Sequence, residues 1–168
     1  ADAFDLGASP RGWGPWGEEA PRAGTHAWVA STGLFTDRFS SATCGGAGAP
    51  DAVARYLAPR DGRYRFRLYA PFRSRLYALV GACGANAQEV ACRPAPGGAL
   101  PGEGYTRLAG SFDHDLVAGE TIHLVVDGLH SPDAGEFVLV VEEPGVCGDG
   151  LVQASEACDD GNLVAGDG

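Results

Sequence analysis

Oxygen-bearing side chains gather between and beyond two cysteines near the end of this chain. Five candidate ligands alternate there with glycine: Asp149, Asp159, Asp160, Asn162 and Asp167. Ca²⁺ takes about six to eight oxygen ligands from flexible loops, and glycine permits the sharp turns that bring such ligands together. The pattern predicts a calcium site, although its spacing is not that of an EF-hand. The same residues are also common turn formers that bond their own backbone.

A second candidate site is a row of three arginines. Arg63, Arg65 and Arg67 alternate with the apolar residues Tyr64, Phe66 and Leu68. Alternation of this kind predicts a strand with one buried face and one solvated face. The arginine face, joined by Arg55, Arg73 and Arg75, could instead bind an anionic glycan, or the acidic segment of a neighbouring copy.

Five cysteines supply the third kind of chemistry: Cys44, Cys83, Cys92, Cys147 and Cys158. In an exported chain, disulfides are the default for them. We predict that Cys83 bonds to Cys92, which would stabilise the fold by roughly 2–3 kcal/mol on the chain-entropy model. Cys44 has no obvious partner, although Cys147 is possible. The odd count leaves one thiol free or paired beyond the chain.

Motifs for catalysis are missing from the sequence. No HExxH helix, nucleophile elbow, phosphate-binding loop or dinucleotide fingerprint occurs. His114 lies between Asp113 and Asp115, which could suggest a metal or acid–base site, but an ordinary exposed or hydrogen-bonded histidine is the favoured interpretation. We therefore expect a protein that is not an enzyme.

Charge divides the chain into two unequal parts. Residues 1–107 carry 12 Arg and 9 acids, a net charge of +3, and residues 108–168 carry 13 acids and no Arg or Lys, a net charge of -13. The acidic part argues against nucleic acid and anionic membranes as partners and favours divalent cations or a basic surface. No run of apolar residues is long enough to predict a membrane-spanning helix.

The elements that position these residues are expected to be strands. The chain has 26 Gly and 11 Pro, and its apolar periodicity is two-fold. Short strands with turns between them indicate an all-β, antiparallel sandwich or barrel. The expected strands lie within residues 25–39 (one or two strands), 53–57, 63–69, 76–82, 108–116, 121–127 and 137–141, with a loop over residues 93–104.

Three parts of the chain follow from this pattern: an extended arm over residues 1–24, the sandwich over residues 25–143, and a small acidic, cysteine-bounded segment over residues 144–168. Val125, Val138 and Val140 would lie on the second face of their strands, where either the arm covers them, which we favour, or they contribute to an interface. Because Ala1 replaces an initiator Met, we also expect that a signal peptide has been removed from an exported protein.

Several segments between residues 26 and 141 have a recognisable combination of turn and core residues: Cys44 to Val53, Tyr56 to Pro59, Gly62 to Phe66, Leu76 to Leu79, Cys83 through Cys92, Leu116 to Thr121, Val125 to Gly128 and Gly135 to Leu139. Through them, residues 26–141 resemble the bacterial pre-peptidase C-terminal (PPC-like) domain of myxobacterial secreted proteins. The resemblance implies a jelly-roll-like β-sandwich that serves binding, secretion or stability. Such domains often carry an Asp-Thr pair where Arg73-Ser74-Arg75 stands here, and an acidic pair where Arg93-Pro94 stands. If those acids bind a cation in relatives, that site is expected to be missing here.

The C-terminal segment contains three closely spaced motifs: Cys147 to Gly150, Glu156 to Asn162 and Gly166 to Gly168. Through these motifs it is similar to the myxobacterial cysteine-rich repeat. In that repeat a cysteine follows the final glycine directly, which would explain the odd cysteine count. Together the two resemblances imply a secreted or cell-surface binding or structural module, stiffened by disulfides and calcium, in adhesion or extracellular assembly. The alternatives are an accessory domain of a larger secreted hydrolase or protease, and a filament subunit.

Overall fold

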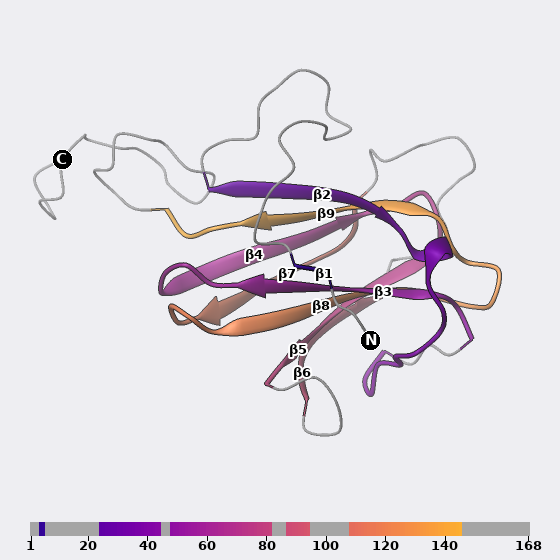
Figure 1. The fold of residues 1–168 in the computed structure, drawn as a ribbon, viewed down its shortest axis with the longest axis horizontal. Coiled ribbons are helices and arrows are strands. Elements are labelled where there is room, and N and C mark those ends of the chain that lie inside the picture. The colour runs from indigo at the N-terminus through magenta and orange to yellow at the C-terminus, as the bar shows by residue number, and fades with distance from the viewer. Residues whose placement is uncertain (1–3, 6–23, 45–47, 82–86, 95–107, 146–168) are drawn as a thin grey trace, which may run out of the picture.

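Two stacked β-sheets make up the fold (Figure 1). The structure is a computed structural model that describes residues 4–5, 24–44, 48–81, 87–94 and 108–145. These residues contain nine strands and one short 3₁₀ helix. The predicted all-β sandwich is confirmed. Within the same ranges, no helix has the length and apolar character needed to cross a bilayer.

The four-stranded sheet carries the predicted arginine row. Its strands lie in the order β2 (Thr25–Ser31), β9 (Glu136–Glu142), β4 (Gly62–Tyr69) and β7 (Leu108–Leu116). All neighbours in this sheet are antiparallel. β7 therefore forms one edge of the sheet, directly beside the arginines of β4.

The second sheet has five strands. Their order is β1 (Phe4–Asp5), β3 (Asp51–Leu57), β8 (Thr121–Gly128), β5 (Ser74–Val80) and β6 (Gln88–Pro94). β1 pairs with β3 in parallel, so this part of the predicted arm lies along the sheet's edge. β6 forms the opposite edge, and within the described residues it pairs with β5 alone.

The core lies between the two sheets and follows the predicted alternation. Tyr64, Phe66 and Leu68 of β4 are fully buried, and Phe66 stacks on Phe112 of β7 with ring centroids 5.1 Å apart. The arginines between them point to the outer face, as strand geometry requires. The two-fold pattern thus assigned both faces of β4 correctly.

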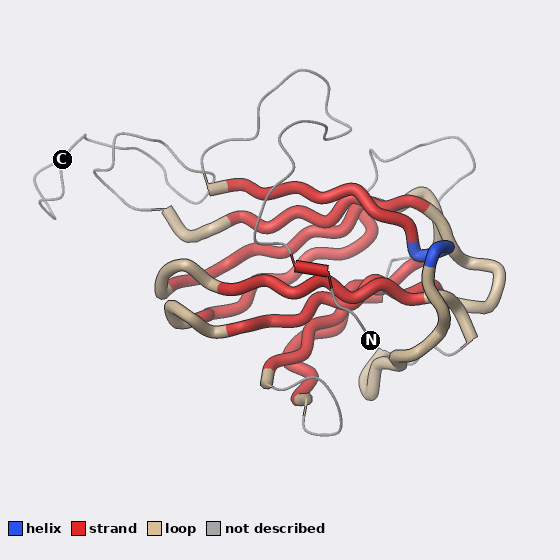
Figure 2. The backbone as a smooth tube through the Cα atoms, viewed as in Figure 1, coloured by secondary structure: helices blue, strands red, loops and turns tan. Residues whose placement is uncertain are grey.

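Two segments differ from the sequence prediction. Residues 88–94 form strand β6, whereas the sequence predicts a loop from residue 93 onward. β6 has no clear apolar alternation, because it is an edge strand with a bulge opposite Ala78 and Leu79. The expected strand region 25–39 ends at Ser31, where the 3₁₀ helix Thr32–Leu34 begins (Figure 2).

Residues 35–44 cross from the 3₁₀ helix to the outer face of the five-stranded sheet, and we call them the strap (Figure 2). Phe39 of the strap packs on a cluster of Val53, Tyr77 and Val125. The strap therefore covers part of the face that carries Val125. Residues 6–23 of the expected arm lie outside the described residues, so coverage of this face by the arm stays a prediction. Val138 and Val140 are buried as well.

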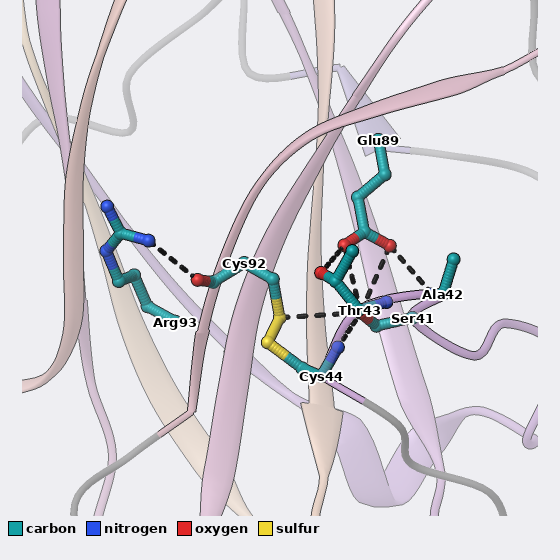
Figure 3. Close-up of a disulfide and its surroundings, with 7 residues drawn as sticks. All are labelled: Ser41, Ala42, Thr43, Cys44, Glu89, Cys92 and Arg93. Carbon is teal, nitrogen blue, oxygen red and sulfur yellow. Dashed lines mark hydrogen bonds between the residues drawn. A yellow bond between two sulfur atoms is a disulfide. The ribbon is translucent and has the colours of Figure 1, made fainter.

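The strap ends in a disulfide between Cys44 and Cys92 (Figure 3). The predicted pairing of Cys83 with Cys92 is therefore wrong, because Cys92 already has a different partner. The strap carries Cys44 across the sheet until its Cα lies 6.1 Å from that of Cys92, which is a usual separation for a disulfide. Cys83 itself lies outside the described residues.

Candidate functional site

On the outer faces of β4 and β7, each of the three arginines lies opposite a different residue of β7. In the register of the two strands, Arg63 lies opposite Asp115, Arg65 opposite Asp113, and Arg67 opposite Ser111. The first two rows therefore pair opposite charges across the strands, an arrangement that stabilises a sheet. The third row has no carboxylate on β7.

Ion pairs follow this register. Arg65 donates two hydrogen bonds to the carboxylate of Asp113, from Nε at 2.8 Å and from Nη2 at 3.2 Å. Arg63 makes two longer ion pairs, from Nη1 to Oδ2 of Asp115 at 3.4 Å and from Nε to Oδ2 of Asp113 at 3.6 Å. The hydrogen bond from Arg65 lowers the pKa of Asp113 below its ordinary value. Asp113 therefore stays ionised and balances the arginines at this end of the row.

Arg67 makes its ion pair on the other side of β4. Its Nη1 lies 2.8 Å from Glu142 of β9, and its side chain is 31% exposed. On the side of β7, the residue opposite Arg67 is Ser111, and the residue opposite Tyr69 is Leu108, so neither partner is charged.

A shallow groove of about 600 Å³ runs over this surface. It is lined by Arg63, Arg65, Arg67, Tyr69, Arg93, Leu108, Ser111, Phe112 and Asp113. Arg93 comes from β6 of the other sheet, which meets β7 near Gly110. A Cβ added at Gly110 would lie 3.5 Å from the Cβ of Arg93.

Positive charge is concentrated at one end of this groove. Arg93 is exposed and donates a hydrogen bond of 2.8 Å to the carbonyl of Cys92. No carboxylate among the described residues makes an ion pair with Arg93. Counting the described residues alone, the end formed by Arg67 and Arg93 has more cations than anions, whereas the end formed by Arg63 and Arg65 is balanced. Such an arrangement suits an anionic group with several acceptor oxygens.

The structure brings the three predicted arginines together and adds a fourth that the sequence analysis did not select. Arg93 lies 26 positions after Arg67 in the chain, and only the packing of β6 beside β7 brings it to the groove. Because β6 is an edge strand without apolar alternation, the sequence around Arg93 gives no signal that its side chain lines the groove.

The predicted calcium ligands Asp149, Asp159, Asp160, Asn162 and Asp167 lie outside the described residues. Calcium binding there stays a prediction. Within the described ranges, no group of three or more His, Cys, Asp or Glu side chains could hold a metal ion. His114 lies opposite Tyr64, whereas Asp113 and Asp115 pair with arginines on the outer face, so these three residues do not converge.

A second polar cluster joins the two sheets at one end of the sandwich. Glu143 accepts hydrogen bonds from His26 Nε2 and Tyr56 Oη at 2.8 Å each, and from Arg60 Nη2 at 2.7 Å. Burial alone would raise the pKa of Glu143, but these bonds outweigh it and lower the pKa to about 2. Because the carboxylate is buried and fully engaged, we assign this cluster to stability.

A third cluster lies beneath the strap. Asp51, Asp127 and Arg75 stand side by side on β3, β8 and β5, and all three are buried. Asp51 accepts hydrogen bonds from the backbone N–H groups of Arg38 and Phe39 at 2.6 and 2.8 Å, which fastens the strap to the sheet. Both carboxylate oxygens of Asp127 lack a hydrogen-bond partner within the described structure.

Asp127 should make stability depend on pH. Burial, then the nearby charge of Asp51, raises its pKa to about 7, against a partial lowering by Arg75, and the strap's Asp37 adds to the rise. A raised pKa means that the folded state holds this proton longer than the unfolded state. The stabilisation is complete below about pH 4 and is lost as the pH rises through about 7. We expect the free energy of unfolding to fall by about 2 kcal/mol between pH 5 and pH 8.

Urea unfolding at both pH values measures this loss. Asp127→Asn holds the neutral form at every pH, so its free energy of unfolding should change much less across the range. An equal loss in Asp127→Asn and in the parent protein would show that another group is responsible.

Comparisons with known proteins show a similarity in fold alone. No protein-family model matches the chain, and no curated protein sequence matches it. A periplasmic inhibitor of g-type lysozyme from Aeromonas hydrophila is 12% identical, with a TM-score of 0.45, over 70% of this chain and 84% of its own. The Yersinia pseudotuberculosis-derived mitogen is 9% identical, with a TM-score of 0.46, over 77% of this chain and 94% of its own.

A family 35 carbohydrate-binding module from an environmental isolate is also similar. It is 12% identical, with a TM-score of 0.36, over 77% of this chain and 98% of its own. These values describe a distant likeness in all-β architecture. The two family resemblances seen in the sequence stay predictions, and the function has to be argued from the groove.

Proposed function

We propose that this protein is a non-enzymatic, extracellular or cell-surface binding module whose groove on the four-stranded sheet binds an anionic polymer such as an acidic glycan. The observation that carries the proposal is the excess of cations at the end of the groove formed by Arg67 and Arg93. The net charge of the whole chain is -10, so a local surplus of positive charge is not a general property of its surface.

The shape of the groove supports a polymer over a small molecule. The groove is shallow and lies across β4 and β7, with arginines at every second position of β4. Side chains on one face of a strand repeat about every 6.6–6.8 Å, so an extended chain with repeated carboxylate or sulfate groups can meet several of them. Tyr69 also lines the groove and offers a ring against which a sugar can pack.

Two further observations support the cellular setting and the lack of catalysis. The Cys44–Cys92 disulfide is typical of proteins in oxidising compartments. Outside the groove, the buried carboxylates Asp51 and Glu143 bond the protein's own groups.

Binding of polygalacturonate and of heparin, measured by calorimetry with neutral dextran as a control, tests the proposal. We expect Arg93→Ala and Arg67→Gln each to weaken binding about 5- to 20-fold, because each removes a charge-assisted contact of about 1–2 kcal/mol. Raising the salt concentration from about 50 mM to about 500 mM should weaken binding further, because mobile ions screen exposed charges.

Arg55→Ala is the matched control, since Arg55 is an exposed arginine on the five-stranded sheet, away from the groove. It should bind both polyanions as the parent protein does. Equal loss in Arg55→Ala and Arg93→Ala would mean that only net charge matters, and the groove would then not be the site. Binding of dextran as tight as that of polygalacturonate would also contradict the proposal.

A further inference from the structure

Strand β6 connects the groove to the strap. Side chains at consecutive positions of a strand point to opposite faces. Cys92 therefore points to the outer face of the five-stranded sheet, where it bonds to Cys44 of the strap. Arg93 points the other way and lines the groove, and its guanidinium donates a hydrogen bond to the carbonyl of Cys92 (Figure 3).

A second attachment holds β6 to the strap three positions earlier. The carboxylate of Glu89 accepts hydrogen bonds from the Ser41 hydroxyl at 3.0 and 3.1 Å and from the Ala42 backbone N–H at 2.8 Å. It also accepts one from the Thr43 hydroxyl. Ser41 in turn accepts hydrogen bonds from the backbone N–H groups of Thr43 and Cys44, so this end of the strap is folded around Glu89 (Figure 3).

These attachments matter because β6 lies at the edge of its sheet, where hydrogen bonding to a neighbouring strand is on one side only. Within the described residues it pairs only with β5, and a bulge interrupts that pairing opposite Ala78 and Leu79. Edge strands with irregular pairing open more readily than central strands. The strap is itself anchored at its other end, where Asp51 of β3 binds the N–H groups of Arg38 and Phe39.

We propose that the Cys44–Cys92 disulfide and Glu89 are positioning elements for Arg93: they hold β6 against the strap and so fix the guanidinium in the groove. This inference rests on the proposed function, because it assigns a role in the binding of an anionic polymer. Reducing conditions that open the disulfide would then weaken binding, although neither cysteine contacts the ligand.

A double-mutant cycle with Arg93 tests the inference. The Cys44→Ser/Cys92→Ser variant should bind polygalacturonate about fivefold more weakly than the parent protein. Without the disulfide, β6 is held less firmly against the strap, and the Arg93 guanidinium then samples several positions in the groove. In an Arg93→Ala background the same cysteine changes should have no further effect. Glu89→Gln, which keeps the disulfide, should weaken binding about twofold and should also have no effect without Arg93.

Thermal unfolding of each variant, followed by circular dichroism, establishes a temperature at which all variants are folded. Binding is measured at that temperature. An equal loss from the cysteine changes with and without Arg93 would overturn the inference, because the disulfide would then act on the whole domain. Unchanged binding in both the cysteine variant and Glu89→Gln would overturn it too. If Arg93→Ala by itself leaves binding intact, the proposed function fails and the positioning role fails with it.

Discussion

Replacing Glu143 by alanine should lower the free energy of unfolding by about 3 kcal/mol. Glu143 is 7% exposed, and its carboxylate accepts hydrogen bonds from three side chains that come from β2, β3 and the β3–β4 turn. Removing it leaves the buried hydroxyl of Tyr56 without its acceptor and Arg60 without its counter-ion. Urea unfolding at pH 7 measures the loss.

The pH dependence of the Glu143 effect identifies its origin. The folded-state pKa of Glu143 is about 2, below the ordinary value of 4.5. A lowered pKa in an acid gives stability that is present above about pH 4.5 and lost as the pH falls toward 2. The difference between the parent protein and Glu143→Ala should therefore shrink between pH 4.5 and pH 2.5. Tyr56→Phe, which removes one of the three bonds, should cost about 1 kcal/mol. A loss in Glu143→Ala that does not change with pH would contradict this account.

Removal of the Cys44–Cys92 disulfide should destabilise the protein by about 4 kcal/mol on the chain-entropy model. The bond joins residues separated by 48 positions, and a loop of that length has many more conformations when it is open in the unfolded chain. We expect the Cys44→Ser/Cys92→Ser variant to unfold at a lower urea concentration. Replacing both cysteines avoids a new thiol that could bond to Cys83, Cys147 or Cys158.

The comparison with Glu89→Gln separates the effect of the cross-link from that of the strap's other contacts. Glu89→Gln leaves the loop closed, so it should destabilise the protein by about 1 kcal/mol, the usual scale for weakened hydrogen bonds. A cysteine variant that unfolds at the same urea concentration as the parent protein would show that the cross-link does not constrain the unfolded chain.

The sequence determined the main features of the sandwich, and the physical reason is local. Alternation of apolar and charged residues from Arg63 to Tyr69 fixes which face of β4 is buried, because neighbouring side chains on a strand point to opposite faces. The same rule placed Arg63, Arg65 and Arg67 on the outer face, as the structure has them. A conformational rule that acts between adjacent residues can be applied without knowing the fold.

Tertiary structure decided the features that depend on which segments meet. The partner of Cys92 could not be found from spacing, since the strap brings Cys44 to it across the sheet while Cys83 is much closer in the chain. Strand β6 gave no pattern, because an edge strand can be irregular and still complete a sheet. Arg93 belongs to the groove only because β6 of one sheet lies beside β7 of the other. Sequence periodicity predicts to which face of its own strand a side chain points. The pairing of a disulfide, the place of an edge strand and the lining of a groove depend instead on contacts between segments that are distant in the chain.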